Sequence, residues 1–186
     1  MTNIDNSKIK KCNVDNVRCK KINVDGAKVW AAEYVAYNNG EECDYDGWNI
    51  AGNTTKTEAS TSPYLRVYAY DTKDKRKTIY SAEKMPTADF NTMTIDFFVD
   101  GRDGYDTRGA GHIMLIENIY NGGIGAKGAV IDINSLDEKY RGQRQTIEVD
   151  ISGIDKDLYL QLLAHSGVDT YDNYFGEAVV YSVAFS

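Results

Sequence analysis

The feature that most constrains this chain is a series of short β-prone runs that extends from residue 64 to the C-terminal end. The runs are rich in β-branched and aromatic residues and are bounded by turn residues, as β-strands are. The eight runs are residues 64–70, 77–81, 93–99, 112–119, 129–133, 145–151, 158–164 and 177–185. Convincing helical periodicity is absent from the sequence, so the pattern predicts an all-β protein.

Alternation within the runs indicates which side of each strand is buried. In residues 93–99 apolar side chains occupy every second position, and residues 147–151 and 179–185 alternate in the same way. The run 158–164 is ambiguous because Asp155 could cap a short helix there, but its alternating pattern and β-rich surroundings favour a strand. Eight short strands without intervening helices predict an antiparallel jelly-roll β-sandwich.

The front of the chain predicts two tandem β-hairpins within residues 9–30. Asp15-Asn16 and Asp25-Gly26 stand at the turns, and Asp-Gly is the stronger signal because both turn positions need positive φ. A lone two-stranded ribbon is marginal in water, so the hairpins must pack on the body or on a neighbouring subunit. We therefore expect residues 1–44 to form an attachment or assembly segment and residues 45–186 to form the jelly-roll domain.

The first hairpin also bears on the cysteines. A two-residue turn places Val14 opposite Val17 and Cys12 opposite Cys19. A disulfide is conceivable there, but three cysteines are a poor disulfide framework, and a reducing cytoplasm favours free thiols. None of the cysteines has CxxC spacing or a nearby histidine, which argues against zinc.

The net charge of −7 is unevenly distributed. Residues 1–30 carry seven Lys or Arg and three Asp, a charge of +4, so residues 31–186 carry −11. An acidic body argues against nucleic acid as a partner. The positive charge of residues 1–30 is explained by a solvated strand face, and docking onto an acidic partner is the alternative. Since membrane-length and signal-peptide apolar runs are both missing, we expect no membrane insertion and no classical secretion.

Two parts of the chain resemble known families. Residues 21–30, KINVDGAKVW, resemble the V-N-G-x-x-V-W hairpin near the front of phage and prophage tail, baseplate and fibre proteins, with Asp replacing the Asn of the turn. Residues 90–99, 147–154, 158–162 and 177–185 resemble strands of galactose-binding-like or carbohydrate-binding jelly-roll modules. Such modules often show F-x-T-L-x-I-D, followed later by I-D-I-S-x-L-x-G-x-Y-Y-L.

These resemblances imply a non-enzymatic virion structural protein, a tail, baseplate, fibre or capsid-surface component, with a lectin-like domain for host surface glycans. They imply assembly in the host cytoplasm, location in the virion, other virion proteins as partners, and a homo-oligomer, most often a trimer in such fibres. The residues expected in assembly are Val24, Asp25, Gly26, Val29 and Trp30. The alternative is a carbohydrate-binding module that does not belong to a virion.

Catalytic and metal motifs are weak. The two histidines, His112 and His165, lie on different predicted strands, and the sequence has no G-x-S-x-G nucleophile elbow. We therefore expect no catalytic residues, no enzyme activity and no cofactor. Asp100, Asp103 and Asp106 are weak calcium candidates, because their spacing differs from that of an EF-hand loop and turns also favour Asp and Gly.

Sugars bind by stacking on exposed aromatic rings while polar side chains read their hydroxyl groups. The 14 tyrosines supply many rings, although tyrosine also suits half-buried sheet surfaces and subunit interfaces. We expect candidates in two polar, aromatic loops and on the solvent-side strand faces. The candidate ligand-binding residues are Tyr105, Arg108, His165, Tyr171, Tyr174, Arg66, Tyr68 and Gln161.

Overall fold

The computed structural model describes twelve stretches of the chain. They are residues 13–14, 17–18, 21–24, 27–31, 33–39, 41, 43–52, 57–71, 75–101, 109–120, 128–166 and 174–186. Within these stretches the regular structure is β-strand, apart from one 3₁₀ turn at Thr87–Asp89. The described part contains no helix long and apolar enough to span a bilayer. The all-β prediction is confirmed.

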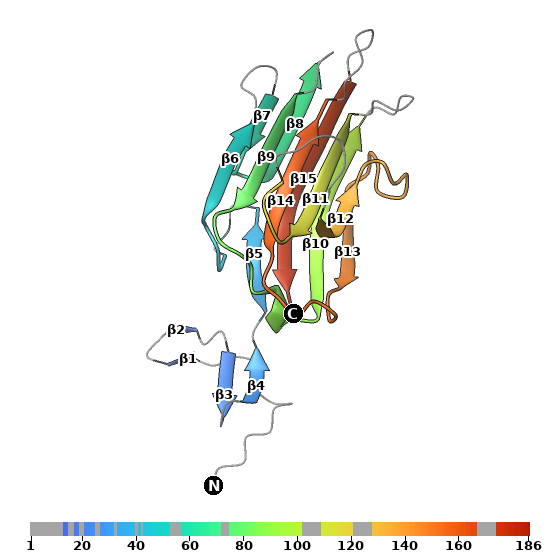
Figure 1. Cartoon of the computed structure of the whole chain (residues 1–186). Helices are drawn as coiled ribbons and strands as arrows, with labels where there is room; N and C mark the ends of the chain where they lie inside the picture. Colours follow the sequence, from blue (N-terminus) through green and yellow to red (C-terminus); the bar gives the residue numbers. More distant parts are fainter. Residues whose placement is uncertain are drawn as a thin grey trace.

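Eleven strands form two antiparallel sheets that face each other (Figure 1). The six-stranded sheet runs β13 (Gln145–Asp150), β10 (Thr92–Gly101), β15 (Tyr174–Phe185), β8 (Leu65–Asp71) and β7 (Thr57–Ser60), with β5 (Tyr34–Asn38) also paired to β15. The five-stranded sheet runs β12 (Ala129–Asn134), β11 (Ala110–Ile116), β14 (Tyr159–His165), β9 (Arg76–Ser81) and β6 (Trp48–Gly52).

The last eight strands have the connectivity of a jelly roll. Nested antiparallel pairs join β8 to β15, β9 to β14, β10 to β13, and β11 to β12. Such nesting is what results when one long double-stranded ribbon is rolled over so that its ends lie side by side. These strands are the eight runs predicted from the sequence, including β14, so the jelly-roll prediction is confirmed. Strands β5, β6 and β7 are additions that the sequence did not reveal.

The core lies between the two sheets and is built from the alternating apolar positions. Met93, Ile95, Phe97 and Val99 of β10 all point inward and are at most 1% exposed, as their spacing predicted. On the facing sheet Ile113, Leu115, Leu160 and Leu162 fill the matching positions. Burial of these side chains contributes about 1.5–3 kcal/mol each and is the main force that holds the sheets together.

At one end of the sandwich the two sheets touch through backbone alone. A Cβ on Gly111 of β11 would lie 1.7 Å from the carbonyl oxygen of Glu177 in β15. A Cβ on Gly176 of β15 would lie 2.2 Å from the carbonyl oxygen of Ala110 and 2.6 Å from that of His165. Only glycine permits this approach, and it fixes the end of β14 against the opposite sheet.

The N-terminal strands pair as the turn residues predicted. β1 (Asn13–Val14) pairs with β2 (Val17–Arg18), with Val14 opposite Val17. β3 (Lys21–Val24) pairs with β4 (Ala27–Ala31), with Val24 opposite Ala27. Cys12 and Cys19 lie outside the described residues, as do Asp25 and Gly26 of the expected assembly set. The division at residue 44 remains a prediction.

Candidate functional site

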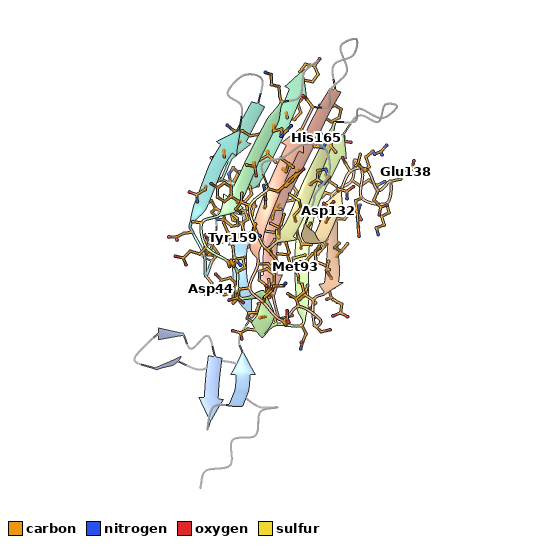
Figure 2. All side chains as sticks on the ribbon, viewed as in Figure 1. Asp44, Met93, Asp132, Glu138, Tyr159 and His165 are labelled. Carbon is orange, nitrogen blue, oxygen red and sulfur yellow. The ribbon has the colours of Figure 1, made fainter. Side chains whose placement is uncertain are left out.

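The outer face of the five-stranded sheet gathers polar and aromatic side chains from every one of its strands. Core residues alternate with outward ones along each strand, so strand pairing determines which outward side chains are neighbours. One transverse row contains Asn49, Tyr80, Gln161, Met114 and Asp132, which come from β6, β9, β14, β11 and β12 in turn. Figure 2 labels Asp132, Tyr159 and His165 on this sheet.

Two histidines and a carboxylate form a hydrogen-bonded chain in this face. His112 Nδ1 lies 3.0 Å from Asp132 Oδ1, and His112 Nε2 lies 3.4 Å from His165 Nε2. His112 is diagonal to each partner across a strand pair, a separation that long side chains can bridge. A proton on His112 Nδ1 would be donated to the Asp132 carboxylate, and His112 Nε2 would then accept the Nε2–H of His165. Both histidines are 1% exposed, whereas the Asp132 side chain is 26% exposed, so the chain is buried at its histidines and reaches solvent at Asp132.

Gln161 fastens the segment after β11 above the same face. Its Oε1 accepts the backbone N–H of Tyr120 at 2.9 Å, and its Nε2 donates to the Tyr120 carbonyl oxygen at 2.7 Å. The second Nε2 hydrogen goes to Thr78 Oγ1 at 2.9 Å, and Thr78 in turn donates to the Leu162 carbonyl oxygen at 2.7 Å. The amide of Gln161 is thus engaged within the chain, and it holds Tyr120 in place as a neighbouring strand would.

The outer face is therefore divided into a covered part and an open part. On β11 and β14 the outward side chains of Met114, Ile116 and Leu163 are at most 1% exposed. Towards the sheet edge, Tyr80 and Tyr159 are partly exposed and Asn49 is exposed. We call Asn49, Tyr80 and Tyr159 the tyrosine shelf.

The two tyrosines of the shelf are neighbours on adjacent strands. Tyr80 pairs with Gln161, two residues beyond Tyr159 on β14, so Tyr80 and Tyr159 are diagonal neighbours whose Cα atoms are about 7–8 Å apart. The segment held by Gln161 borders the shelf on the β11 side, because Ile116 pairs directly with Tyr159. The shelf is thus a strip of partly exposed rings with a border on one side and the edge strand β6 on the other.

Charged groups lie on the segments beside Tyr159. Lys84 Nζ lies 5.6 Å from the centre of the Tyr159 ring, and Lys156 Nζ lies 2.5 Å from Glu117 Oε1. The hydrogen bond from Lys156 lowers the pKa of Glu117, and the same bond raises the pKa of Lys156. At neutral pH this rim therefore presents one carboxylate acceptor and two ammonium donors beside an aromatic ring.

Such a shelf suits a ligand with apolar faces and hydroxyl edges. A partly exposed tyrosine ring offers a flat surface for stacking, and its hydroxyl group can form hydrogen bonds. The Asn49 amide and the charged rim supply donors and acceptors at the sides. A small number of polar groups around an apolar surface fixes the orientation of a bound small molecule.

The structure distributes the predicted ligand-binding residues over both faces of the sandwich. Gln161 and His165 lie on the five-stranded sheet, whereas Arg66 and Tyr68 lie on the outer face of the six-stranded sheet. There Arg66 Nε is 2.6 Å from Glu177 Oε1, and the Arg66 guanidinium lies 5.3 Å from the centre of the Tyr68 ring. The two pairs do not form one site.

The remaining candidates lie mostly outside the described residues. Tyr105, Arg108, Tyr171, Asp103 and Asp106 are all in that group.

Two further candidates, Tyr174 and Asp100, fall on strands. Tyr174 is the first residue of β15, and Asp100 Oδ1 accepts the backbone N–H of Gly101 at 2.8 Å. Across the described stretches, no three His, Cys, Asp or Glu side chains are grouped to hold a metal ion.

The sequence reasoning missed all three members of the tyrosine shelf. Tyr159 stands two positions before Gln161 in a strand that was predicted, so their shared face could have been inferred from alternation. Tyr80 joins them only because β9 pairs with β14, a contact between distant parts of the chain. Asn49 lies on β6, which was not predicted.

Comparison with known proteins gives a similarity of fold only. The sequence matches no protein-family model and no curated protein. Among solved structures, the chain is similar to TmCBM61 in complex with beta-1,4-galactotriose, with 9% identity, 74% of this chain and 87% of that chain covered, and a TM-score of 0.39. A family 29 carbohydrate-binding module from Piromyces equi gives 10% identity, coverage of 82% and 89%, and a TM-score of 0.40. A family 11 module from Clostridium thermocellum, in complex with a beta-1,3-1,4-mixed-linked tetrasaccharide, gives 12% identity, coverage of 82% and 94%, and a TM-score of 0.40. The fold assignment itself rests on the strand order of this chain.

Proposed function

We propose that this chain is a non-catalytic, lectin-like module that binds a glycan on the tyrosine shelf. The observation that carries the proposal is the pair of partly exposed rings, Tyr80 and Tyr159, side by side on the open part of a rigid sheet face. Side chains on paired strands keep their spacing before a ligand arrives, so little ordering is needed on binding. This favours a carbohydrate-binding module over a purely structural virion component.

The arrangement supports binding rather than hydrolysis. A glycosidase needs two carboxyl groups placed on either side of the bond that is cleaved. On this sheet face, the Glu117 carboxylate is paired with Lys156, and Asp132, two strands away from Tyr159, is directed at the buried His112. Neither carboxylate faces the other across the rings, so the shelf offers a platform and not an acid–base pair.

The expected affinity is modest. Two rings and a few rim groups contact a small part of a ligand that stays largely hydrated, so we expect dissociation constants between about 1 mM and about 1 μM. This range corresponds to about −4 to −8 kcal/mol.

The experiment is a glycan array probed with the full chain, followed by titration calorimetry with the best ligand. We expect Tyr80→Ala and Tyr159→Ala each to weaken binding at least about tenfold, a loss of about 1.4 kcal/mol. The matched control is Tyr68→Ala, which removes a partly exposed ring from the opposite face of the sandwich and should leave the affinity unchanged. Loss of binding in Tyr68→Ala, with both shelf variants unaffected, would place the ligand on the other sheet and overturn the proposal.

We also propose, separately, that residues 1–44 attach the module to a larger assembly, of which a virion is the candidate from the resemblance of residues 21–30. The pairing of β3 with β4 supports this, because it places Val24, Val29 and Trp30 on one hairpin. Light scattering after gel filtration of the full chain and of residues 33–186, which keep β5 in the sandwich, tests it. A full chain that is oligomeric while residues 33–186 are monomeric supports an assembly segment, whereas equal oligomeric states for the two proteins count against it.

A further inference from the structure

The edge of β6 directs backbone groups away from its own sheet. β6 is the last strand of the five-stranded sheet, and Figure 1 shows it at the rim. The N–H of Ala82 donates to the carbonyl oxygen of Gly47 at 2.7 Å, and Asn49 is paired with Tyr80. Antiparallel ladders alternate, so Gly47, Asn49 and Ala51 bond towards β9, and the N–H and C=O of Ile50 point outward.

The side chains of β6 do not protect this edge from pairing with another strand. Its sequence, Trp-Asn-Ile-Ala-Gly, has no charge and no proline, and Ile50 is 49% exposed. Natural sheets protect their edges with charged residues, proline or covering segments, because an exposed apolar edge pairs with other strands. Among the described residues no strand pairs with the outer edge of β6, so this edge, with its exposed isoleucine, is suited to pairing with a partner strand.

Two other edge strands of the sandwich carry such protection. Each contains a carboxylate, Asp132 in β12 and Glu148 in β13.

Strand β5 is also uncharged, but its outer edge is occupied. The Val35 N–H donates to Asp44 Oδ2 at 2.9 Å, and the Asp44 N–H donates to the Val35 carbonyl oxygen at 2.8 Å. β6 thus differs from the edge strands around it.

We propose that β6 pairs with β6 of a second copy of this chain, which joins two five-stranded sheets into one continuous antiparallel sheet. A two-fold axis at Ile50, the middle residue of Trp48–Gly52, lets the strand pair with its own copy in one register. The outward N–H of Trp48 donates to the carbonyl oxygen of Asp46 at 3.2 Å, so the central pair at Ile50 supplies the main hydrogen bonds of the contact. Ile50 then lies opposite the same residue of the second copy, and each exchanges its N–H and C=O with the other. Trp48 lies opposite Gly52, the one position in β6 with no side chain to obstruct an indole ring.

The contact is small, so the dimer is weak. A strand of five residues is only about 17 Å long and buries far less than the roughly 1,600 Å² of a standard interface. We therefore expect a dissociation constant of about 10 μM to 1 mM. Each chain carries a net charge of −7, so the copies repel each other and added salt should strengthen the dimer.

The inference goes beyond glycan binding and does not depend on it. Sedimentation equilibrium of the full chain, from about 5 μM to about 1 mM and at low and high salt, is the test. Ile50→Lys places a charge at the centre of the proposed contact and should abolish the rise in mass with concentration, so that the variant keeps the mass it has at about 5 μM. The matched control is Val130→Lys, which changes a residue 42% exposed on the opposite edge strand, β12, and should dimerise as the unchanged protein does.

Several results would overturn the inference. They are an unchanged protein whose mass does not rise with concentration, a rise that survives Ile50→Lys, or a rise that Val130→Lys abolishes equally. Far-ultraviolet circular dichroism of both variants checks that the fold is intact. Glycan titration of the unchanged protein and of Ile50→Lys separates the two proposals. Glycan binding by Ile50→Lys upholds the shelf without the edge contact, and an unchanged protein that associates through β6 but binds no glycan upholds the edge without the shelf.

Discussion

Gly111→Ala tests whether the backbone contact between the two sheets governs the stability of the sandwich. The added Cβ would lie 1.7 Å from the Glu177 carbonyl oxygen, 2.3 Å from its carbonyl carbon and 3.0 Å from the Ala178 nitrogen. These atoms belong to a central strand paired on both sides, so they cannot rotate away as a side chain could. Carbon and oxygen need about 3.3 Å even in a weak contact, so the sheets must separate by more than about 1 Å.

Separation of the sheets is costly because it loosens the core on both sides of the contact. A gap of 0.5–1 Å already forfeits about a quarter to a half of each dispersion contact along its lining. Overpacking in cores costs about 1–3 kcal/mol and occasionally more, and here the obstacle is backbone on both sides. We therefore expect Gly111→Ala to lower the free energy of unfolding by at least about 3 kcal/mol, which lowers Tm by about 6–12 °C for a domain of this size.

The same substitution elsewhere in the chain provides the control. A Cβ on Gly153 meets no atom within 4 Å, so Gly153→Ala should change stability by less than about 1 kcal/mol, in the stabilising direction if at all. Urea unfolding followed by circular dichroism, with thermal scans, measures both variants. A Gly111→Ala protein within about 1 kcal/mol of Gly153→Ala would refute the reasoning, because the sheets would then be free to move apart.

Two further predictions concern the site and the pH dependence of stability. Gln161→Leu should lower the free energy of unfolding by about 2–4 kcal/mol, because it removes the side chain that bonds the N–H and C=O of Tyr120. Urea unfolding measures this loss, and faster hydrogen exchange at the Tyr120 amide should accompany it. Burial, and then the nearby Asp44 carboxylate, raises the pKa of Tyr34 from 10.0 to about 12. The contribution of Tyr34 to the free energy of unfolding is therefore complete below pH 10 and is lost as the pH rises towards 12. Between pH 9 and pH 12 the free energy of unfolding should fall less steeply with pH in Tyr34→Phe than in the unchanged protein. Equal pH dependence in the two proteins would rule out Tyr34 as the cause.

The jelly roll was predictable because burial on one side imposes alternation on a strand. β10 is buried at every second position from Met93 onward, and the sequence shows that period without ambiguity. The three missed strands lie towards the sheet edges, where one or both faces are poorly covered. In β6 even Ile50 is exposed, so burial imposed no alternation of apolar and polar residues that would have revealed the strand.

The site was less predictable because its members come from different strand pairs. His112 and Asp132 lie on consecutive strands, but residues 117–128 connect these strands and the register shifts beside Leu115, so their pairing could not be counted from the sequence. Tyr80 and Tyr159 meet only through the pairing of β9 with β14, and the rolling of the ribbon decides that pairing. The expected ligand set was divided because alternation places Arg66 and Gln161 on solvent-side faces without indicating which sheet each belongs to.

The shelf and the β6 edge have a joint consequence for ligand size. In the proposed dimer the strand order across the junction is β9, β6, then β6 and β9 of the second copy. Three strand spacings separate the two Tyr80 residues by about 14 Å across the sheet, and the register through Ile50 offsets them by about 7 Å along it. A short oligosaccharide therefore contacts one shelf, while a longer chain can contact both. Occupation of both shelves converts the second contact into an intramolecular one, so a long glycan gains affinity and stabilises a dimer that the free protein forms only weakly.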